Sequence, residues 1–353
     1  MRRGSTSHGR SLPGVHLSDI DYHLPEELIA QSPVEPRDSA RLLVDTGGVP
    51  RDATVSDLES ILQEGDLLVV NDTRVLPARL SLHRASGGAA EVFLLESLDD
   101  SGACWEAMVR PARKLREGEV LLHGSDPAVR VGARTAAGDT FEVELLGDDP
   151  SGVPGRIGTV PLPPYIRDPL ADPERYQTVY SREPRSAAAP TAGLHFTPGL
   201  LDRLGRRGVA TANVELVVGI DTFKPVTEED PTRHRIHTER YRVPESTIAA
   251  VEAARRVVAV GTTAARALES VAATGKREGR TSLFISRGHE WRNVDLLMTN
   301  FHMPRTTLLL MIDSFVGPRW RDLYAHAVRE RYRFLSFGDA MLLDRHAGGY
   351  PRV

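Results

Sequence analysis

The stretch that decides the fold is Leu67-Leu68-Val69-Val70-Asn71-Asp72-Thr73-Arg74. Its four consecutive apolar residues predict a buried strand over residues 67–70. Polar residues follow at once, at the carboxyl end of that strand, which is where α/β proteins gather their ligands. The stretch therefore predicts both a sheet core and a functional rim.

Beyond this stretch the chain changes character. Short segments with alternating apolar residues are separated by Gly, Asp and Ser turns, and they lie at residues 79–83, 91–95, 105–109, 119–122, 129–131 and 141–145. This spacing predicts a small antiparallel β-barrel or sandwich. A Gly/Pro-rich boundary at residues 155–164 closes the unit, so we expect an insertion over residues 77–160.

After the insertion the pattern alternates between strands and helices. We expect strands at residues 209–218, 257–260, 283–286 and 296–298, and helices at 247–255, 263–273, 307–315 and 321–330. Such alternation predicts an α/β domain with a largely parallel sheet. We assign residues 15–76 and 161–345 to this domain, and residues 1–14 and 346–353 to flexible tails.

Composition narrows the class of protein. The 353 residues suffice for about two domains, and the net charge of −4 argues against broad coating by nucleic acid. Arginines nevertheless concentrate at residues 203–207, 233–242 and 319–333, either as phosphate-binding faces or as solvated helix faces. The single Cys104 excludes an internal disulfide, and we expect it to be buried between Ala103 and Trp105. No apolar run nears the roughly 20 residues of a membrane span and no secretory signal is visible, so we expect a cytoplasmic protein.

A second informative segment is AAPTAGLHFT at residues 188–197. Its apolar residues fit neither strand nor helix periodicity, whereas Thr197 and Pro198 predict the start of a helix. His195 then lies just before a helix N-terminus, where backbone N–H groups favour negative charge.

Three polar clusters, residues 71–74, 261–263 and 299–302, each follow a predicted strand, so we expect them to meet at one rim. Thr262 and Thr263 are alternatively ordinary helix caps, and Phe301 with His302 alternatively belongs to the core. The glycine-rich dinucleotide, Walker and Gly-x-Ser-x-Gly signatures are absent. His234, His237 and Glu239 are spaced like metal ligands, but no helix pattern places them on one face, and we favour hydrogen bonding or proton transfer.

Together the motifs resemble one family, the S-adenosylmethionine:tRNA ribosyltransferase-isomerases of queuosine biosynthesis. The resemblance rests on RDSARLL (37–43), GDLLVVNDTRVLPARL (65–80), PLPPYI (161–166), YQTVY (176–180), APTAGLHF (189–196), GTT (261–263), TNFH (299–302), YRF (332–334) and FGDAM (337–341). It implies a larger barrel-like α/β domain with a small inserted antiparallel β-barrel.

The resemblance also implies a reaction. The ribosyl part of S-adenosylmethionine would be transferred and isomerised onto 7-aminomethyl-7-deazaguanine at the wobble position of a tRNA, giving epoxyqueuosine-tRNA, adenine and methionine. No metal and no cofactor beyond S-adenosylmethionine as co-substrate is implied. A monomer is compatible with the sequence, which leaves the oligomeric state open.

We therefore expect a catalytic group and a substrate-binding group. The candidate general bases are His195, His237 and Asp72. The expected substrate-binding residues are Asn71, Thr73, Arg74, Thr191, Ala192, Gly193, Phe196, Thr222, Phe223, Glu239, Gly261, Thr262, Thr263, Arg266, Glu269, Asn300, Phe301, His302 and Asp339.

The chain departs from the family pattern at four notable positions, Val217, Asp221, Ala264 and Arg287, which replace a histidine, a glycine, a serine and a proline. These departures leave two alternatives open. One is a paralogue that uses S-adenosylmethionine or another nucleoside with a different acceptor, and the other is a noncatalytic tRNA-binding protein.

Overall fold

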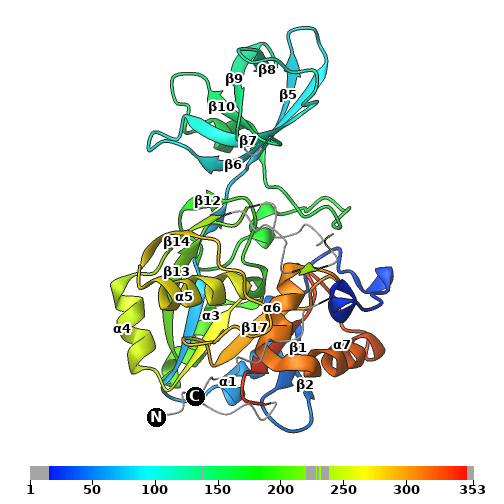
Figure 1. The fold of residues 1–353 in the computed structure, drawn as a ribbon, viewed down its shortest axis with the longest axis vertical. Helices are drawn as coiled ribbons and strands as arrows, with labels where there is room; N and C mark the ends of the chain where they lie inside the picture. The colour runs from blue at the N-terminus through cyan, green and yellow to red at the C-terminus, as the bar shows by residue number, and fades with distance from the viewer. Residues whose placement is uncertain (1–15, 137, 220–227, 229, 232–237, 348–353) are drawn as a thin grey trace, which may run out of the picture.

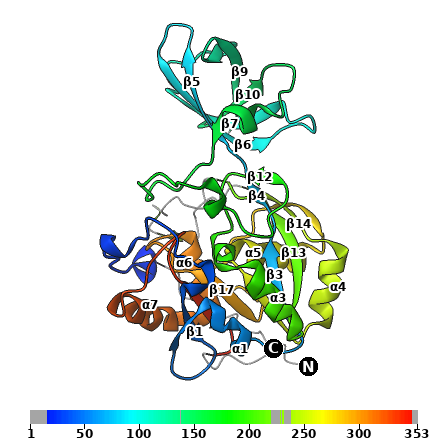
Figure 2. The same ribbon diagram turned by 180° about the vertical axis from the view of Figure 1, so that it is seen from behind.

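The structure, a computed structural model, describes residues 16–136, 138–219, 228, 230–231 and 238–347. A small barrel stands on one end of a larger α/β domain, and two chain segments join them (Figure 1). The same arrangement is visible from behind (Figure 2). This architecture confirms the predicted class, an α/β protein with an inserted antiparallel β-barrel.

Within the described residues the large domain is built on a nine-stranded sheet. In spatial order its strands are β16 (Glu278–Thr281), β14 (Glu239–Arg242), β13 (Ala210–Leu216), β3 (Asp66–Asn71), β15 (Arg256–Val260), β17 (Leu296–Asn300), β18 (Ala340–Asp344), β1 (Arg41–Asp45) and β2 (Arg51–Thr54). The central strands β13, β3, β15 and β17 are parallel, but β14, β16 and β2 pair antiparallel, as do β17 and β18. A second parallel pair, β18 with β1, lies nearer one edge. The sheet is therefore mixed rather than largely parallel as the alternation predicted, because half of its neighbouring strands pair antiparallel.

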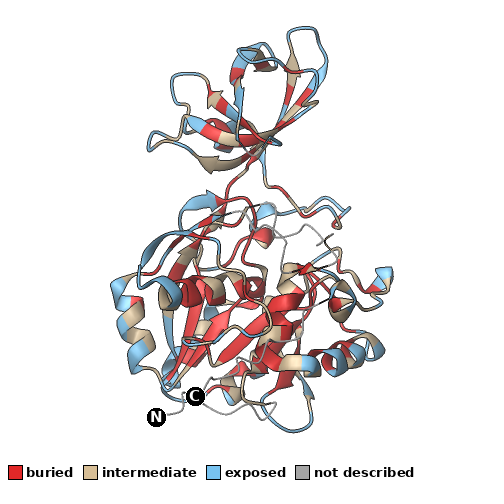
Figure 3. Ribbon diagram, viewed as in Figure 1, coloured by how far each residue is buried: buried red, intermediate tan, exposed pale blue. Residues whose placement is uncertain are grey.

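Strand alternation divides the core of the α/β domain between two faces of the sheet. Leu67 and Val69 of β3 point into one cluster, and Leu68 and Val70 into the other. The first face is covered by α5 (Thr262–Thr274), α6 (Thr307–Val316) and α7 (Trp320–Arg329), with α4 (Glu245–Ala253) beside them. The second face is covered by α1 (Leu58–Ile61) and α3 (Pro198–Arg206). Both faces are buried, so the strands read as continuous apolar runs (Figure 3).

The small domain is an antiparallel barrel. Its strands follow the order β11 (Gly158–Thr159), β5 (Arg79–Arg84), β6 (Ala89–Ser97), β7 (Cys104–Arg110), β10 (Phe141–Leu145), β9 (Asp126–Arg134) and β8 (Val120–His123). Pairing of β5 with β8 closes it, and the short helix α2 (Val153–Ile157) precedes β11. The strands β4 (Arg74–Val75) and β12 (Pro184–Ser186) pair below it as a separate ribbon.

Two expectations about single elements are wrong. Residues 283–286 form no strand, because Leu283 and Ile285 are packed as a loop against the core, and a buried loop produces the same apolar run as a strand. Cys104 is exposed rather than buried, because Trp105 and Val109 of β7 point into the barrel and their alternation turns Cys104 outward.

In the part of the chain that the structure describes, every helix is too short or too polar to cross a membrane.

Candidate functional site

A small pocket lies at the carboxyl ends of β15 and β17. Residues 189–192 line it from one side, residues 261–263 and 299–303 from the other. Thr191 Oγ1 donates a hydrogen bond to Asn300 Oδ1 at 2.8 Å, which ties the two segments together. Two of the three polar clusters expected at one rim, residues 261–263 and 299–302, thus line one pocket, together with Thr191 and Ala192. The third cluster, residues 71–74, does not line it.

Gly261 makes the sharp turn between β15 and α5. Its φ is +89° and its ψ is 154°, a combination that only glycine adopts readily. The turn places Thr262 and Thr263 at the start of α5, where they line the pocket.

His195 lies behind Asn300. Its buried Nε2 is 3.3 Å from Asn300 Nδ2. Burial lowers the pKa of His195 to about 4, with a further lowering by the positive charges of Arg333 and Arg37. The imidazole is therefore neutral at pH 7, and its Nε2 can accept a hydrogen bond from the Asn300 amide N–H. It faces a third, smaller cavity beside Arg37 and Arg175 rather than the small pocket.

The neighbours of His195 have packing roles. Phe196 is fully buried in the core cluster beneath β3. Gly193 lies so close to Tyr180 that a Cβ added to the glycine would come within 2.0 Å of the Tyr180 hydroxyl oxygen. Thr197 caps α3 through a 3.1 Å hydrogen bond from Leu200 N, which confirms the predicted helix start.

His302 and Phe301 line the far wall of the small pocket. Burial lowers the pKa of His302 to about 3, and its Nε2 is 3.0 Å from Thr299 Oγ1. Phe301 belongs at the same time to an aromatic cluster with Tyr324 and Phe334. These two residues thus serve the core and the pocket together.

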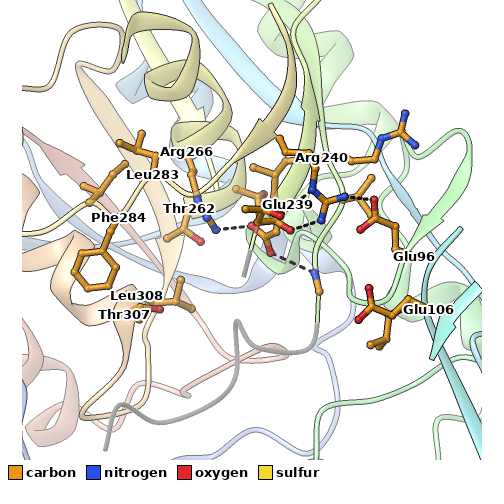
Figure 4. Close-up of a pocket in the computed structure, with 18 of the residues that line it drawn as sticks. Glu96, Glu106, Glu239, Arg240, Thr262, Arg266, Leu283, Phe284, Thr307 and Leu308 are labelled. Carbon is orange, nitrogen blue, oxygen red and sulfur yellow. Dashed lines mark hydrogen bonds and ion pairs between the residues drawn. The ribbon is translucent and has the colours of Figure 1, made fainter. Parts of the chain in front are cut away.

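A large pocket opens between the two domains (Figure 4). The α/β domain contributes β14 and the start of α5, where Arg266 Nη1 forms an ion pair with Glu239 Oε2. Glu239 Oε1 also accepts a hydrogen bond from Gly219 N at 3.2 Å. The barrel contributes Leu95, Glu96, Glu106, Met108, Asp139 and Thr140.

The two pockets meet at the start of α5, since Thr262 and Thr263 line both of them. Thr263 Oγ1 at this junction and Arg266 Nε, one turn further along α5, are buried without a hydrogen-bond partner among the described residues. Buried polar groups are nearly always hydrogen-bonded, so these two atoms are candidates for ligand contact.

The cluster at the end of β3 lies outside the linings of both pockets. Asn71 joins β3 to β13, because its Nδ2 donates to Leu216 O at 2.9 Å and its Oδ1 accepts from Leu216 N and Thr73 N. Asp72 is 3.5 Å from Arg182 Nε, and burial raises the pKa of Asp72, an effect that Arg182 opposes. Arg74 forms an ion pair with Glu174.

Two further expected binding residues hold loops in place. Glu269 is buried on α5 and accepts hydrogen bonds from the backbone N–H groups of Arg292 and Asn293. Asp339 accepts from Arg41 N and Arg333 N at 2.9 and 2.8 Å, and burial raises its pKa. Neither side chain lines the large or the small pocket.

His237, Thr222 and Phe223, with the departure at Asp221, lie outside the described residues. Among the residues that are described, no group of three His, Cys, Asp or Glu side chains is placed to hold a metal ion.

The sequence did not point to the barrel's share of the large pocket. Glu96 forms an ion pair with Arg280 of β16, and Glu106 accepts a hydrogen bond from Thr140 Oγ1 at 2.6 Å. Glu106 is at an outward position of β7, which also describes an ordinary solvated face. Glu96 would face inward with Val92 and Leu94 by strict alternation, and an irregularity in β6 between Leu94 and Glu96 turns it outward, so the sequence held no signal for it.

Three of the departures from the family pattern can be placed. Arg287 forms a bidentate ion pair with the fully buried Asp313, at 3.0 and 3.1 Å. Ala264 packs in the core on α5, and Val217 lines the large pocket while its N–H donates to Arg240 O.

The fold and the two neighbouring pockets define a two-domain α/β protein built to hold ligands between a sheet rim and a barrel. A family model described as "Queuosine biosynthesis protein" matches residues 17–343. The chain belongs to this family, the S-adenosylmethionine:tRNA ribosyltransferase-isomerases, and is an enzyme of the transferase class.

Individual relatives agree with this assignment. S-adenosylmethionine:tRNA ribosyltransferase-isomerase of Rubrobacter xylanophilus is 49% identical over 333 residues, 93% of this chain and 98% of that protein. The protein of the same name from Symbiobacterium thermophilum is 48% identical over 346 residues, 93% of this chain and 100% of that protein. The crystal structure of S-adenosylmethionine tRNA ribosyltransferase from Thermotoga maritima has a TM-score of 0.53 and 34% identity, and the match covers 92% of this chain and 99% of that one.

Proposed function

We propose that this enzyme transfers and isomerises the ribosyl moiety of S-adenosylmethionine onto 7-aminomethyl-7-deazaguanine at the wobble position of a tRNA. The products are epoxyqueuosine-tRNA, adenine and methionine. The reaction takes place in the cytoplasm, where its tRNA substrate is found, and S-adenosylmethionine is the co-substrate without a further cofactor.

One observation carries the proposal, namely that the two pockets are neighbours and share Thr262 and Thr263 in their linings. A group transfer between two large substrates needs binding sites that lie next to each other. Thr263 Oγ1 lies at this junction and Arg266 Nε one turn further along α5, in the wall of the large pocket. Neither atom has a hydrogen-bond partner among the described residues, and the ribose hydroxyls or the carboxylate of S-adenosylmethionine would supply one.

The chemistry requires a base and a way to release adenine. A sulfonium acidifies the hydrogens of the neighbouring C5′, so a base forms a carbanion there, adenine departs, and the substrate amine displaces methionine. Asn300 reaches the small pocket, where the second lone pair of its Oδ1 can accept a hydrogen bond from a purine amino group, since the first accepts from Thr191 Oγ1. Neutral His195 and Asp339 O accept from the Asn300 NH2 group and so orient the amide. Asp72, His195 and His237 stay the candidate bases.

Adenine release tests the proposal. The purified protein is incubated with S-adenosylmethionine, with and without a tRNA that carries the aminomethyl-deazaguanine base. Released adenine is quantified, and the mass of the modified nucleoside is determined by mass spectrometry. We expect adenine only with that tRNA, together with the mass of epoxyqueuosine. Adenine release without nucleoside modification would contradict the proposed acceptor.

A pair of threonine variants tests the site within the same assay. Thr263→Val removes the hydroxyl at the junction, and we expect kcat/KM for S-adenosylmethionine to fall roughly three- to tenfold, the loss of one hydrogen bond. Thr211→Val, at an exposed position near the start of β13, is the matched control. Equal kinetics for the two variants would remove Thr263 from the site.

The two alternatives give different results. Binding of S-adenosylmethionine without adenine release on this tRNA favours a paralogue with another acceptor. Retention of tRNA without binding of S-adenosylmethionine favours a noncatalytic tRNA-binding protein, whose affinity would fall steeply with salt.

A further inference from the structure

The barrel carries a loop rich in exposed positive charge. Residues 110–116, Arg-Pro-Ala-Arg-Lys-Leu-Arg, follow β7 and lead towards β8. We name this segment the basic loop. Its four cations, Arg110, Arg113, Lys114 and Arg116, are all exposed.

The charges in the basic loop differ from the other arginines of the barrel. Arg79, Arg84 and Arg130 each form an ion pair with a glutamate on a neighbouring strand or loop. Among the described residues, no ion pair within 4 Å joins a carboxylate to any of the four cations of the basic loop. Two glutamates follow the loop. Glu117 is exposed, and Glu119 forms its ion pair with Arg84, although its carboxylate also accepts a hydrogen bond from Arg116 N and lies near the Arg116 charge. The positive charge is therefore concentrated in the basic loop itself, on a barrel whose other segments carry more acidic than basic residues, within a chain whose net charge is −4.

The basic loop is an ordered scaffold. Leu115 is 7% exposed and packs into the barrel core. Lys114 N and Leu115 N both donate to Pro111 O, at 2.9 and 3.3 Å, and Arg134 Nη2 donates to Ala112 O at 3.1 Å. Charges held on a fixed backbone lose little conformational entropy when they bind a partner.

The basic loop continues from the large pocket. Trp105 and Val109 of β7 fill the barrel core, so Glu106, Met108 and Arg110 share the opposite side of the strand. Glu106 and Met108 line the large pocket, and Arg110 follows Met108 by about 7 Å of strand.

A second connection runs through Arg134. This residue donates to Ala112 O of the basic loop and, through Nη1, to Gly138 O at 2.9 Å. Gly138 directly precedes Asp139 and Thr140, which line the large pocket. Two separate parts of the barrel therefore lead from the pocket to the same cations.

We propose that the basic loop binds the phosphate backbone of the tRNA next to the nucleotide that occupies the large pocket. This inference rests on the proposed function for the identity of the polyanion. A free nucleoside would be contained in the pocket, whereas a tRNA has neighbouring nucleotides that extend from the pocket onto the barrel. There the exposed guanidinium and ammonium groups contact its phosphates without regard to sequence.

The test is the salt dependence of tRNA binding. Fluorescence anisotropy with a labelled tRNA, in the presence of S-adenosylmethionine, gives the dissociation constant at a series of KCl concentrations. For Arg113→Gln/Lys114→Gln we expect binding to weaken roughly tenfold or more at low salt. The slope of log Kobs against log salt should become shallower by about 1.4–1.8, which corresponds to two lost phosphate contacts. Each single variant should give about half of that change.

The matched control is Arg206→Gln/Arg207→Gln. These two arginines are also exposed, adjacent and without a carboxylate partner in the described residues, but they lie at the end of α3 that leads into the start of β13, opposite the pocket end of the sheet. We expect this control to keep the slope of the unmodified enzyme. Equal slopes for the two double variants, at equal unfolding temperatures and equal affinity for S-adenosylmethionine, would overturn the proposal.

Turnover separates this inference from the proposed function. Adenine release by Arg113→Gln/Lys114→Gln should show an increased KM for tRNA and an unchanged kcat. If the unmodified enzyme binds tRNA through the basic loop but releases no adenine, the reaction is wrong and the surface stands. If it releases adenine and the variant keeps the same KM for tRNA, the surface is wrong and the reaction stands.

Discussion

At the scale of single residues, polar side chains at the ends of strands divided into two kinds. Thr191, Thr262, Thr263 and Asn300 line pockets, whereas Asn71 joins two strands. The sequence predicts both kinds in the same way, because an amide after a strand suits a ligand and a neighbouring backbone equally well. Only the tertiary structure shows which side chains line a pocket and which bind a neighbouring strand, because it determines the partners of each.

Gly261 provides a prediction at this scale. Its backbone lies in a glycine-only region, although a Cβ there would have room, with the nearest atoms at 3.7 Å. Gly261→Ala should therefore lower the free energy of unfolding by about 1–3 kcal/mol through backbone strain rather than through a clash. Urea unfolding measures this, with Gly275→Ala, whose φ is +69° in open surroundings, as a milder comparison of about 1–2 kcal/mol. No loss of stability in Gly261→Ala would show that the turn relaxes.

His302 provides a second prediction. Burial lowers its pKa from about 6.5 to about 3, so the unfolded chain binds a proton between these values and the folded chain does not. As the pH falls from 6.5 towards 3, the enzyme should lose about 1.4 kcal/mol of unfolding free energy per pH unit relative to His302→Gln. Urea titrations of both proteins at several pH values measure the difference. Parallel pH profiles would mean that His302 titrates normally in the folded enzyme.

At the scale of elements, alternating apolar residues predicted most strands of the barrel correctly. A continuous apolar run was a less reliable indicator of a strand. The segments at residues 105–109 and 141–145 became β7 and β10. Residues 283–286 are equally apolar, yet they form a loop beside the pocket, because apolar character records burial and not backbone pairing. Cys104 was assigned from its neighbours in the chain, whereas the strand's period determines which way it points.

The loop after β16 gives a prediction about an ion pair. Arg287→Ala would leave the buried Asp313 with the Trp320 indole N–H, at 3.0 Å, as its one side-chain donor among the described residues. We expect a loss of about 3 kcal/mol in unfolding free energy, and a partial recovery in Arg287→Ala/Asp313→Asn because the uncompensated charge is gone. Thermal and urea unfolding measure both effects.

The control for this ion pair is Arg277→Ala, which removes an exposed partner of Glu245 and should change stability by less than about 1 kcal/mol. Equal effects of Arg287→Ala and Arg277→Ala would show that Asp313 finds another partner.

At the scale of the whole molecule, the sequence predicted the two kinds of domain but not the space between them. Spacing along the chain identified a barrel and an α/β unit, since each is formed by local alternation. The large pocket needs Glu96 of the barrel and Arg280 of β16 side by side, although 184 positions separate them in the chain. No periodicity carries that information, and the sequence therefore located the rim of the sheet without its opposite wall.

The place where the barrel joins the α/β domain has a consequence for how such a protein is assembled. The chain enters the barrel at β5 and leaves it at β11, and these two strands are hydrogen-bonded neighbours, with Leu80 opposite Gly158. Once the barrel has formed, its two ends are held together, so the rest of the chain experiences an insertion of about 80 residues as if it were a short turn. The entropic cost of bringing the two ends of the insertion together is therefore compensated by contacts within the barrel. The barrel and the α/β domain can thus change in sequence and length independently of each other.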